Sequence, residues 1–167
     1  MTNKTFVYPE LETERLQLNL LKLDDAEKVM AHFSDPEVTR FMDIEPCKDL
    51  KEAEEIIQYH IDDSGCRWGI FYKEQFVGTI GFHYLRKNDR DYIAEIGFDL
   101  SKQYWGKGFM TEAIREVISF GFTQMGLTMI DATVEPDNEK SINLMKRLEF
   151  NRAEELQDHL VYFYLKN

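Results

Sequence analysis

The sequence predicts a single α/β (α+β) domain built on a mixed, mostly antiparallel sheet of about seven strands with about four helices. Three observations lead to this prediction. The 167 residues are the length of one ordinary domain, so we expect 1–167 to share one core. Hydrophobic residues make up 43% of the chain, which places it well outside the disordered class. Alternating segments and helically spaced segments succeed one another without a repeat, a linker or a low-complexity run.

The first half of the chain predicts one strand, two helices and then an antiparallel meander. In 15–21, leucines alternate with polar residues, which is typical of a half-buried strand. Asp24 and Asp49 each precede a glutamate by three residues, the spacing of a capping box at a helix start. Short polar links join the strands that follow. The predicted helices cover about 24–33 and 49–60, and the predicted strands of the meander cover 67–72, 76–85 and 92–100.

The second half predicts a β-α-β crossover and a short helix followed by two strands. A glycine-rich turn at 103–108 separates the strand at 92–100 from a long helix at about 110–125. The next strand, 129–134, ends before a proline. Because such crossovers are right-handed, we expect these two strands to be parallel neighbours. The remaining predicted elements are a helix at 141–148 and strands at about 153–156 and 160–165.

Charge and cysteine content exclude several classes of protein. The 31 acidic and 20 basic side chains give a net charge of −11, which repels phosphate backbones and favours cationic partners such as amines. Cys47 and Cys66 match no zinc-site spacing, and two thiols in a domain of this size suggest a reducing compartment. No signal peptide and no membrane-spanning stretch is evident. We therefore expect a cytoplasmic protein without metal, nucleic acid or membrane partners.

The turn between the strand and the long helix predicts an anion-binding site. Gly106 and Gly108 have no Cβ atom, so neighbouring backbone N–H groups can point into one hollow. The first helical turn adds unpaired N–H groups and the positive end of the helix dipole, an arrangement that binds phosphate or diphosphate. The dinucleotide fingerprint does not fit, because its third glycine is replaced by Thr111, and no P-loop is present. A plain tight turn is the alternative interpretation.

The glycine-rich turn and the segment after the next strand resemble paired motifs of the GNAT N-acetyltransferases. The pattern Gln103-x-x-Gly106-x-Gly108, between a strand and the long helix, resembles the acyl-CoA-binding motif of that family. The segment 136–150 resembles the family's next motif, and its Asn-x-x-Ser start is closest to the RimJ/RimL-like branch. The opening at 12–16 is similar to the same branch. The resemblance covers nearly the whole chain.

This resemblance implies an acyl-CoA acyltransferase fold whose sheet is splayed between its fourth and fifth strands. It also implies acetyl-CoA or coenzyme A as the cosubstrate, an amine as the acceptor and no metal. The pantetheine arm would pair with the backbone of the fourth strand, and the amides of 105–111 would hold the diphosphate. The residues that the resemblance assigns to the cofactor are Phe98, Asp99, Leu100, Gln103, Trp105, Gly106, Lys107, Gly108, Phe109, Met110, Thr111, Asn138 and Ser141.

Glu95 and Ser141 are the candidate catalytic residues. Glu95 lies among apolar neighbours of a strand, where a carboxylate can accept the proton of an amine or bind the amine, and a solvent-facing carboxylate is the alternative. Asn138 suits the N-cap of the next helix, with Ser141 at its third position. The resemblance implies that Ser141 protonates or hydrogen-bonds the departing thiolate, and a helix-start serine without a catalytic task is the alternative.

Two positions depart from the family pattern. Many members have a tyrosine general acid where this chain has Met145, whose thioether cannot give a proton and which we expect in the core. Glu149 stands where a glycine is usual, which puts the turn at the helix end in doubt. His83, in the third predicted strand, is a weaker candidate base, because a strand histidine is more often structural.

Together these observations predict an acetyl-CoA-dependent N-acetyltransferase that acts on a primary amine. The acceptor would be a protein N-terminus, a polyamine or another small amine, attacked directly in a ternary complex. One alternative is a non-catalytic CoA-binding sensor or interaction module, and another is a nucleotide-phosphate binder. A homodimer formed through the edge of the last strands is compatible with the sequence.

Overall fold

The structure, a computed structural model, describes residue 4 and residues 6–167, and one eight-stranded sheet runs through them. The strand order is β1-β2-β3-β4-β5-β6-β8-β7. Every neighbouring pair is antiparallel except β5 and β6, which are parallel as the crossover predicts. The strands are β1 (Leu11–Glu12), β2 (Leu16–Leu20), β3 (Cys66–Tyr72), β4 (Gln75–Lys87), β5 (Tyr92–Leu100), β6 (Met129–Val134), β7 (Asn151–Arg152) and β8 (Val161–Lys166).

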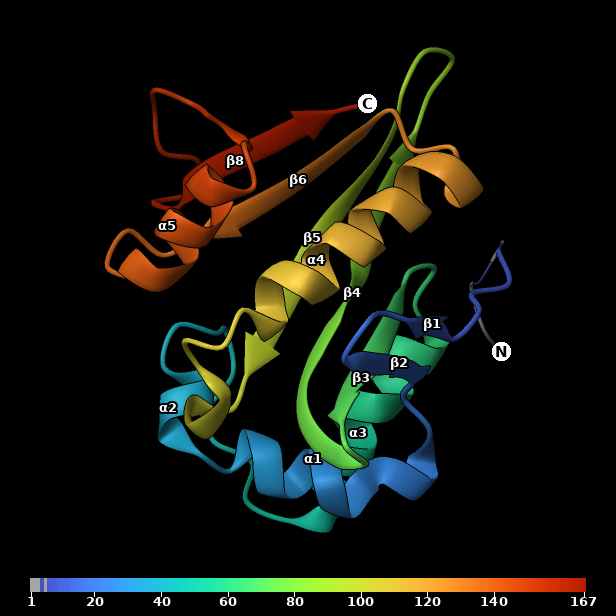
Figure 1. The fold of residues 1–167 in the computed structure, drawn as a ribbon, viewed down its shortest axis with the longest axis vertical. Coiled ribbons are helices and arrows are strands. Elements are labelled where there is room, and N and C mark those ends of the chain that lie inside the picture. Colours follow the sequence, from blue (N-terminus) through green and yellow to red (C-terminus); the bar gives the residue numbers. More distant parts are fainter. Residues whose placement is uncertain (1–3, 5) are drawn as a thin grey trace.

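Helices cover the sheet in two groups (Figure 1). The long helix α4 lies across the sheet and continues as a π-helical turn, whereas α1, α2 and α3 gather at the lower end of the molecule in this view. Among the described residues, no helix is both long enough and apolar enough to cross a membrane. The helical segments are η1 (Leu23–Asp25), α1 (Ala26–Phe33), α2 (Pro36–Thr39), α3 (Leu50–Asp62), η2 (Lys102–Tyr104), α4 (Phe109–Phe120), η3 (Gly121–Met125) and α5 (Glu139–Arg147).

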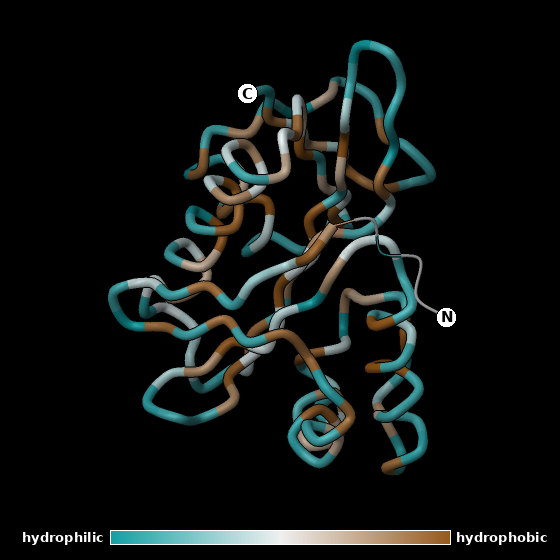
Figure 2. Tube along the Cα trace, turned by 90° about the vertical axis from the view of Figure 1, so that its right-hand side faces the viewer, coloured by the Kyte–Doolittle hydropathy of each residue, from teal (hydrophilic) through white to brown (hydrophobic). Residues whose placement is uncertain are grey.

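Two hydrophobic clusters hold these layers together. The larger one joins α4 and α5 to one face of the sheet, and Trp68, Phe82 and Phe163 are its largest fully buried side chains. The smaller one lies among α1, α2 and α3 and includes Val29 and Ile57. Each such side chain contributes about 1.5–3 kcal/mol when it is removed from water. Figure 2 shows hydrophobic segments along the strands and a hydrophilic tip on the protruding hairpin between β4 and β5.

Helix starts follow local capping chemistry, with two shifts from the prediction. The Asp49 carboxylate accepts a hydrogen bond from the backbone N–H of Glu52 at 2.9 Å and caps α3 as predicted. The Glu52 carboxylate, however, accepts from the N–H of Lys48 at 2.8 Å rather than from that of Asp49. Before α1 the prediction was wrong, because Asp25 rather than Asp24 closes the turn, by accepting from the N–H of Lys22 at 3.0 Å.

The predicted strand at about 153–156 is wrong. The ladder with β8 is shorter and lies earlier, at Asn151 and Arg152. The chain then bends through exposed residues and returns through a turn at Asp158 and His159, whose φ angles of 50° and 67° end any extended run. Charged side chains in this segment have no apolar face to bury, so the strand ends at Arg152, although the Ala153 N–H still donates to the carbonyl of Tyr162 at 2.9 Å.

The feature that positions the site is the separation of β5 from β6. These strands are in register only at Ile93–Met129, Ala94–Ile130 and Glu95–Asp131. Beyond Glu95, β5 continues for five residues with β4 on one side, while β6 turns towards β8 (Figure 1). The sheet is therefore splayed between the strands that carry 92–100 and 129–134, as the resemblance implied.

Candidate active site

The open edge of β5 begins where its pairing with β6 ends. Residues 96–100 pair with β4 as far as Leu100, and in the described structure no strand occupies their other edge. Free N–H and C=O groups along such an edge can pair with an extended ligand. The indole Nε1 of Trp105 donates to the carbonyl of Leu100 at 2.9 Å, which closes the far end of the edge.

The glycine-rich turn follows this edge and leads into α4. Gly106 and Gly108 have φ angles of 76° and 79°, in the left-handed region that favours glycine. Within the described residues, no protein group accepts a hydrogen bond from the backbone N–H of any residue from Gly106 to Thr111. The N–H of Trp105 already donates to the carbonyl of Lys102 at 3.0 Å. Of the backbone amides expected to bind a diphosphate, 105–111, the one at Trp105 is therefore not free. A Cβ atom built on Gly106 meets nothing within 4 Å.

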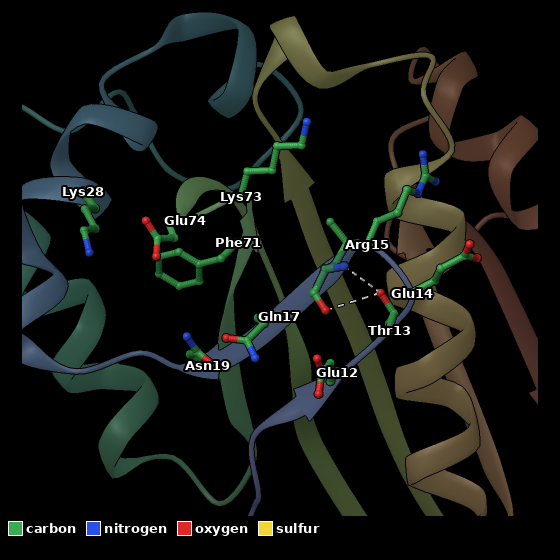
Figure 3. Close-up of a pocket in the computed structure, with 11 residues that line it drawn as sticks. Glu12, Thr13, Glu14, Arg15, Gln17, Asn19, Lys28, Phe71, Lys73 and Glu74 are labelled. Atoms are coloured by element: carbon green, nitrogen blue, oxygen red, sulfur yellow. Dashed lines mark hydrogen bonds between the residues drawn. The ribbon is translucent and has the colours of Figure 1, made fainter.

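Arg15 immediately precedes β2 and bonds to the start of α4, and Figure 3 shows its side chain at the edge of a pocket. Its Nε donates to Glu112 Oε1 at 2.8 Å, and its Nη1 donates to the carbonyl of Lys107 at 3.0 Å. Burial alone raises the pKa of Glu112, but hydrogen bonds from Thr13 and Arg15 outweigh it and hold that pKa below its ordinary value. The guanidinium also lies 4.6 Å from the ring centre of Phe109. Sequence reasoning gave Arg15 no role, although it lies in the motif at 12–16.

A pocket of about 480 Å³ lies over β2 beside Arg15 (Figure 3). Three cationic and three anionic side chains line it, so it has no net charge with which to select an ion. Glu95 is not among its lining residues. The charged residues that line it are Glu12, Glu14, Arg15, Lys28, Lys73 and Glu74.

The first turn of α5 faces the glycine-rich turn. The Asn138 carboxamide accepts from the N–H of Ser141 at 3.3 Å, so the predicted cap is confirmed. The Ser141 hydroxyl has no hydrogen-bond partner in the described part of the chain. Lys140 Nζ lies 3.5 Å from the ring centre of Trp105, which brings α5 against the turn. Met145 is fully buried, as expected of a core residue.

Glu95 occupies the point where β5 and β6 separate. Its Oε1 lies 2.9 Å from Nε2 of His83 on β4, and the two side chains are 23% and 30% exposed. A Cβ atom on Gly97 would lie 2.8 Å from Cε1 of His83, so Glu95 and Gly97 share a face as the alternation predicts. Glu95 is therefore a paired carboxylate on the floor of a partly open site, not a freely solvated one.

Asp99 is the centre of a buried polar network on the same face. Its carboxylate accepts from Arg67 Nη2 at 3.0 Å, from Thr79 Oγ1 at 2.7 Å and from the Thr79 N–H at 3.0 Å, and it lies 2.6 Å from His32 Nε2. Burial raises the pKa of Asp99, but His32, Arg67 and Thr79 together lower it to about 2. Because this side chain is fully engaged, only the backbone of Asp99 is left to face a ligand on the open edge.

A β-bulge brings a second charged cluster to the splay point. The pairing of β4 with β5 shifts by one residue between His83 and Arg86, and Tyr84 adopts a φ of 50°. The bulge turns Arg86 towards Asp131 of β6, whose carboxylate accepts from Arg86 Nη2 at 2.8 Å and from the Tyr162 hydroxyl at 2.7 Å. Burial and Asp131 raise the pKa of Tyr162. An aspartate inside the apolar strand 129–134 was the signal that sequence reasoning passed over.

The predicted site residues thus fall into two groups at the two ends of the open edge. Glu95 lies at its start, and the turn from Gln103 to Thr111 lies beyond its end, beside Asn138 and Ser141. Gln103 is exposed, and no contact joins Glu95 to Ser141 among the described residues. Nor does the described chain contain a group of three or more His, Cys, Asp or Glu side chains able to hold a metal ion.

The turn fits the diphosphate of a CoA thioester. It offers consecutive free amides at a helix N-terminus, left-handed glycines and open space above Gly106. Arg15 adds a cation beside these amides.

The chain is similar to known acetyltransferases in sequence and in fold. Residues 15–151 match the family described as acetyltransferase (GNAT) domain. The uncharacterized N-acetyltransferase p20 of Bacillus licheniformis is 40% identical over 156 residues, which cover 89% of this chain and 86% of that protein. A spermidine N(1)-acetyltransferase of Escherichia coli is 26% identical over 145 residues, covering 84% and 75% of the two chains. The solved structure of RimL, a ribosomal L7/L12 alpha-N-protein acetyltransferase in complex with coenzyme A, has a TM-score of 0.82 at 14% identity. The match covers 95% of this chain and 98% of that chain, so the two share the fold. The family match spans most of the chain, and the chain therefore belongs to the GNAT acetyltransferase family.

Proposed function

We propose that this chain transfers the acetyl group of acetyl-CoA to a primary amine, which attacks the thioester directly in a ternary complex. The observation that supports this most is the run of unpartnered backbone N–H groups from Gly106 to Thr111 where α4 begins. Such donors, added to the positive end of a helix dipole, suit a diphosphate. The acceptor is a protein N-terminus, a polyamine or another small amine, and the spermidine acetyltransferase among the relatives acts on an amine of this kind.

The cofactor is proposed to run along the open edge of β5. The backbone of Phe98, Asp99 and Leu100 would pair with the pantetheine arm, since this edge lacks a strand neighbour in the described structure. Asn138 and Ser141 would lie against the sulfur end of the arm. The residues proposed to hold the diphosphate end are Gln103, Gly106, Lys107, Gly108, Phe109, Met110 and Thr111, with the indole of Trp105 packed beside them.

Bound acetyl-CoA supplies an activated thioester, and side chains of the protein accept and donate the protons of the reaction. We assign Glu95 the role of accepting a proton from the acceptor amine, directly or through water, or of binding the amine. Attack by the free amine forms the C–N bond and breaks the C–S bond. The Ser141 hydroxyl, which has no partner in the described part of the chain, is proposed to donate a hydrogen bond or a proton to the departing sulfur. His83 holds Glu95 in place.

The test begins with ligand binding. A ligand that binds only the folded state raises the free energy of unfolding by about 2.7 kcal/mol at a concentration of 100 Kd. We expect acetyl-CoA to raise Tm and ATP to leave it unchanged. The opposite result would favour the nucleotide-phosphate binder.

A second measurement separates an enzyme from a non-catalytic CoA-binding module. The specific observation that favours the module is Met145, which is buried where many relatives of this fold have a tyrosine. We expect thiol release from acetyl-CoA to depend on added amine and on enzyme concentration. Binding of acetyl-CoA without amine-stimulated thiol release, across a panel of polyamines, small amines and N-terminal peptides, would assign the chain to the module.

A further inference from the structure

We propose that Arg67 determines acceptor specificity. It would select an amine that carries a carbonyl or carboxylate oxygen next to the reacting nitrogen, an α-amino acyl compound, in preference to polyamines and simple alkylamines. This inference rests on the proposed function, in which Glu95 receives the amine. Arg67 lies on β3, outside the motifs at 103–111 and 136–150.

Arg67 lies across two strands because two glycines make room for it. It is in register with Gly81 of β4, which is in register with Gly97 of β5. A Cβ atom on Gly97 would lie 2.6 Å from Arg67 Nη1, a separation that real Cβ contacts do not show. The arginine side chain therefore lies over the row of glycines and ends above Gly97 on β5. Gly97 is also the second residue beyond the last pairing of β5 with β6.

Two of the three nitrogens of this guanidinium are held by the protein. Nε donates to Thr79 Oγ1 at 2.9 Å, and Nη2 donates to Asp99 Oδ2 at 3.0 Å. Nη1 has no acceptor among the described residues, although the Arg67 side chain is only 8% exposed. Every fully buried polar side-chain atom of the described structure does have a partner, so Nη1 lies at a surface that solvent can reach. A rigid, nearly buried arginine with one free N–H₂ is a preorganised donor.

Nη1 shares its surroundings with the Glu95–His83 pair. The same Cβ position on Gly97 lies 2.6 Å from Arg67 Nη1 and 2.8 Å from His83 Cε1, and His83 Nε2 lies 2.9 Å from Glu95 Oε1. The surroundings of Gly97 thus contain a free donor, Arg67 Nη1, and the imidazole of His83, which contacts the Glu95 carboxylate. An acceptor that reaches both the donor and the carboxylate needs a nitrogen and an oxygen on neighbouring atoms, as in an α-amino acyl group.

The neighbouring charges favour an oxygen over a second ammonium. Asp99 balances the charge of Arg67, so Glu95 remains as the carboxylate without a guanidinium partner and provides for one cationic nitrogen. A second ammonium near Nη1 would meet like charge and no acceptor. Burial, together with the charge of Arg67, lowers the pKa of His60 on α3 to about 3, so this imidazole adds no cation at neutral pH. The remaining free group is a donor, and its complement is a carbonyl or carboxylate oxygen.

The experiment compares two acceptors that differ only in the oxygen-bearing group. L-Alaninamide and isopropylamine share the branched carbon and the amine, and a carboxamide in one replaces a methyl group in the other. For the full chain with saturating acetyl-CoA, kcat/KM is measured for each and corrected for the fraction of free amine. We expect alaninamide to be preferred by roughly 10- to 150-fold, the value of one hydrogen bond to a charged donor. Spermidine should rank with isopropylamine.

Two variants test whether the preference for alaninamide depends on Arg67 Nη1. Gly97→Ala puts a methyl group against Nη1, and Arg67→Lys keeps a cation beside Asp99 but removes the forked donor. Arg67→Lys should lower kcat/KM for alaninamide by about tenfold or more and change that for isopropylamine less than about threefold. Gly97→Ala also crowds His83, the partner of Glu95, so it should lower kcat/KM for both acceptors, and that for alaninamide by the larger factor. Lys166→Gln, which removes an exposed cation at the end of β8, is the matched control and should retain the wild-type preference. Tm and the acetyl-CoA affinity verify that each variant is folded.

Several results would overturn the proposal. One is a wild-type protein that acetylates isopropylamine or spermidine as fast as alaninamide, and another is an equal loss for both acceptors in the variants. Binding of alaninamide and isopropylamine to the CoA-saturated protein, measured by calorimetry, gives an answer that does not need turnover. If no amine is acetylated, the proposed function fails. In that case tighter binding of alaninamide, lost in Gly97→Ala, still supports the role of Arg67, and equal binding rejects it.

Discussion

His32 Nε2 lies 2.6 Å from Asp99 Oδ1, and this contact joins α1 to the strand that carries the open edge. The other ring nitrogen of His32 lies 2.9 Å from the Ser101 hydroxyl, immediately before the turn that leads to Gly106. One imidazole therefore connects the wall formed by α1 with both the end of β5 and the start of the proposed diphosphate site. Because Arg67 binds the opposite oxygen of Asp99, the same carboxylate also fixes the proposed specificity residue.

The first prediction concerns acid stability and follows from Asp99. Its pKa in the folded protein is about 2, below the ordinary value of 3.8, because His32, Arg67 and Thr79 stabilise the carboxylate. A depressed carboxyl pKa contributes stability that is fully present above pH 4 and is lost as the pH falls through 2. The loss assigned to this one group is about 2 kcal/mol in the free energy of unfolding.

Urea unfolding between pH 6 and pH 2 measures this loss. Asp99→Asn should be less stable than the wild type at pH 6, and its free energy of unfolding should fall less steeply between pH 4 and pH 2. Glu154→Gln, an exposed carboxylate outside the network, is the control and should follow the wild-type curve. Parallel curves for the wild type and Asp99→Asn would show that Asp99 is not the group responsible.

The second prediction concerns Glu95. Replacing it by glutamine keeps a hydrogen-bond partner for His83 but removes the ability to accept a proton. We expect kcat to fall by about 100-fold or more, as for loss of a general base, while the KM for acetyl-CoA changes less than about threefold. Steady-state thiol release across pH 6–9 is the measurement, with Glu155→Gln, at an exposed carboxylate after β7, as the control. Wild-type rates at every pH would remove Glu95 from the mechanism.

The third prediction uses two glycines with the same backbone conformation. Gly106 and Gly126 have φ angles of 76° and 80°, and a Cβ atom on either meets nothing within 4 Å. Replacement by tryptophan should therefore destabilise both variants similarly, by about 1–2 kcal/mol for the left-handed conformation. Only Gly106→Trp should weaken acetyl-CoA binding, because its side chain would cover the amides at the start of α4. Calorimetric titration measures the affinity of both variants for acetyl-CoA. Equal affinities would show that the diphosphate binds elsewhere.

Most of the fold was predicted from the periodicity of hydrophobic residues and from the order of the predicted elements. Leucine alternation located β2, and Leu16 and Leu18 are buried as it requires. The crossover rule gave the parallel pair of β5 and β6. The elements that were missed are short, such as β1 and α2, because two to four residues contain no period. The misplaced strand at 153–156 failed for a related reason, since the four residues Ala-Glu-Glu-Leu contain no alternation.

Only part of the candidate site could be predicted from the sequence. Local chemistry revealed the turn at Gly106 and Gly108, because glycines and a helix start are adjacent along the chain. The partners of Glu95 and Asp99 come from other strands and from α1, and their pairing depends on register. A charged residue within an apolar strand, such as Arg67, signals a buried partner without naming it. The bulge at Tyr84, which redirects Arg86, has no marker in a single sequence.

The fourth prediction concerns the end of α5. Glu149 adopts a φ of 64°, and the N–H groups of Glu149 and Phe150 donate to the carbonyls of Lys146 and Met145, each at 3.0 Å. This is a Schellman turn, in which the left-handed position usually belongs to glycine. The usual turn therefore forms in spite of the glutamate, at a cost in strain. Glu149→Gly should raise the free energy of unfolding by about 0.5–1 kcal/mol, because relief of the strain exceeds the added flexibility of the unfolded chain.

Glu139→Gly, in the first turn of the same helix, is the opposite case. Its backbone is ordinary right-handed helix, so glycine there only adds flexibility to the unfolded state and should lower the free energy of unfolding by about 0.5–1 kcal/mol. Urea unfolding of the two variants at neutral pH compares one substitution in two backbone conformations. Because the helix dipole favours an anion at the first turn and disfavours one at the last, loss of each negative charge also contributes, and Glu139→Gln and Glu149→Gln measure that contribution separately. Destabilisation of both proteins would mean that Glu149 makes a contribution that outweighs its strained conformation.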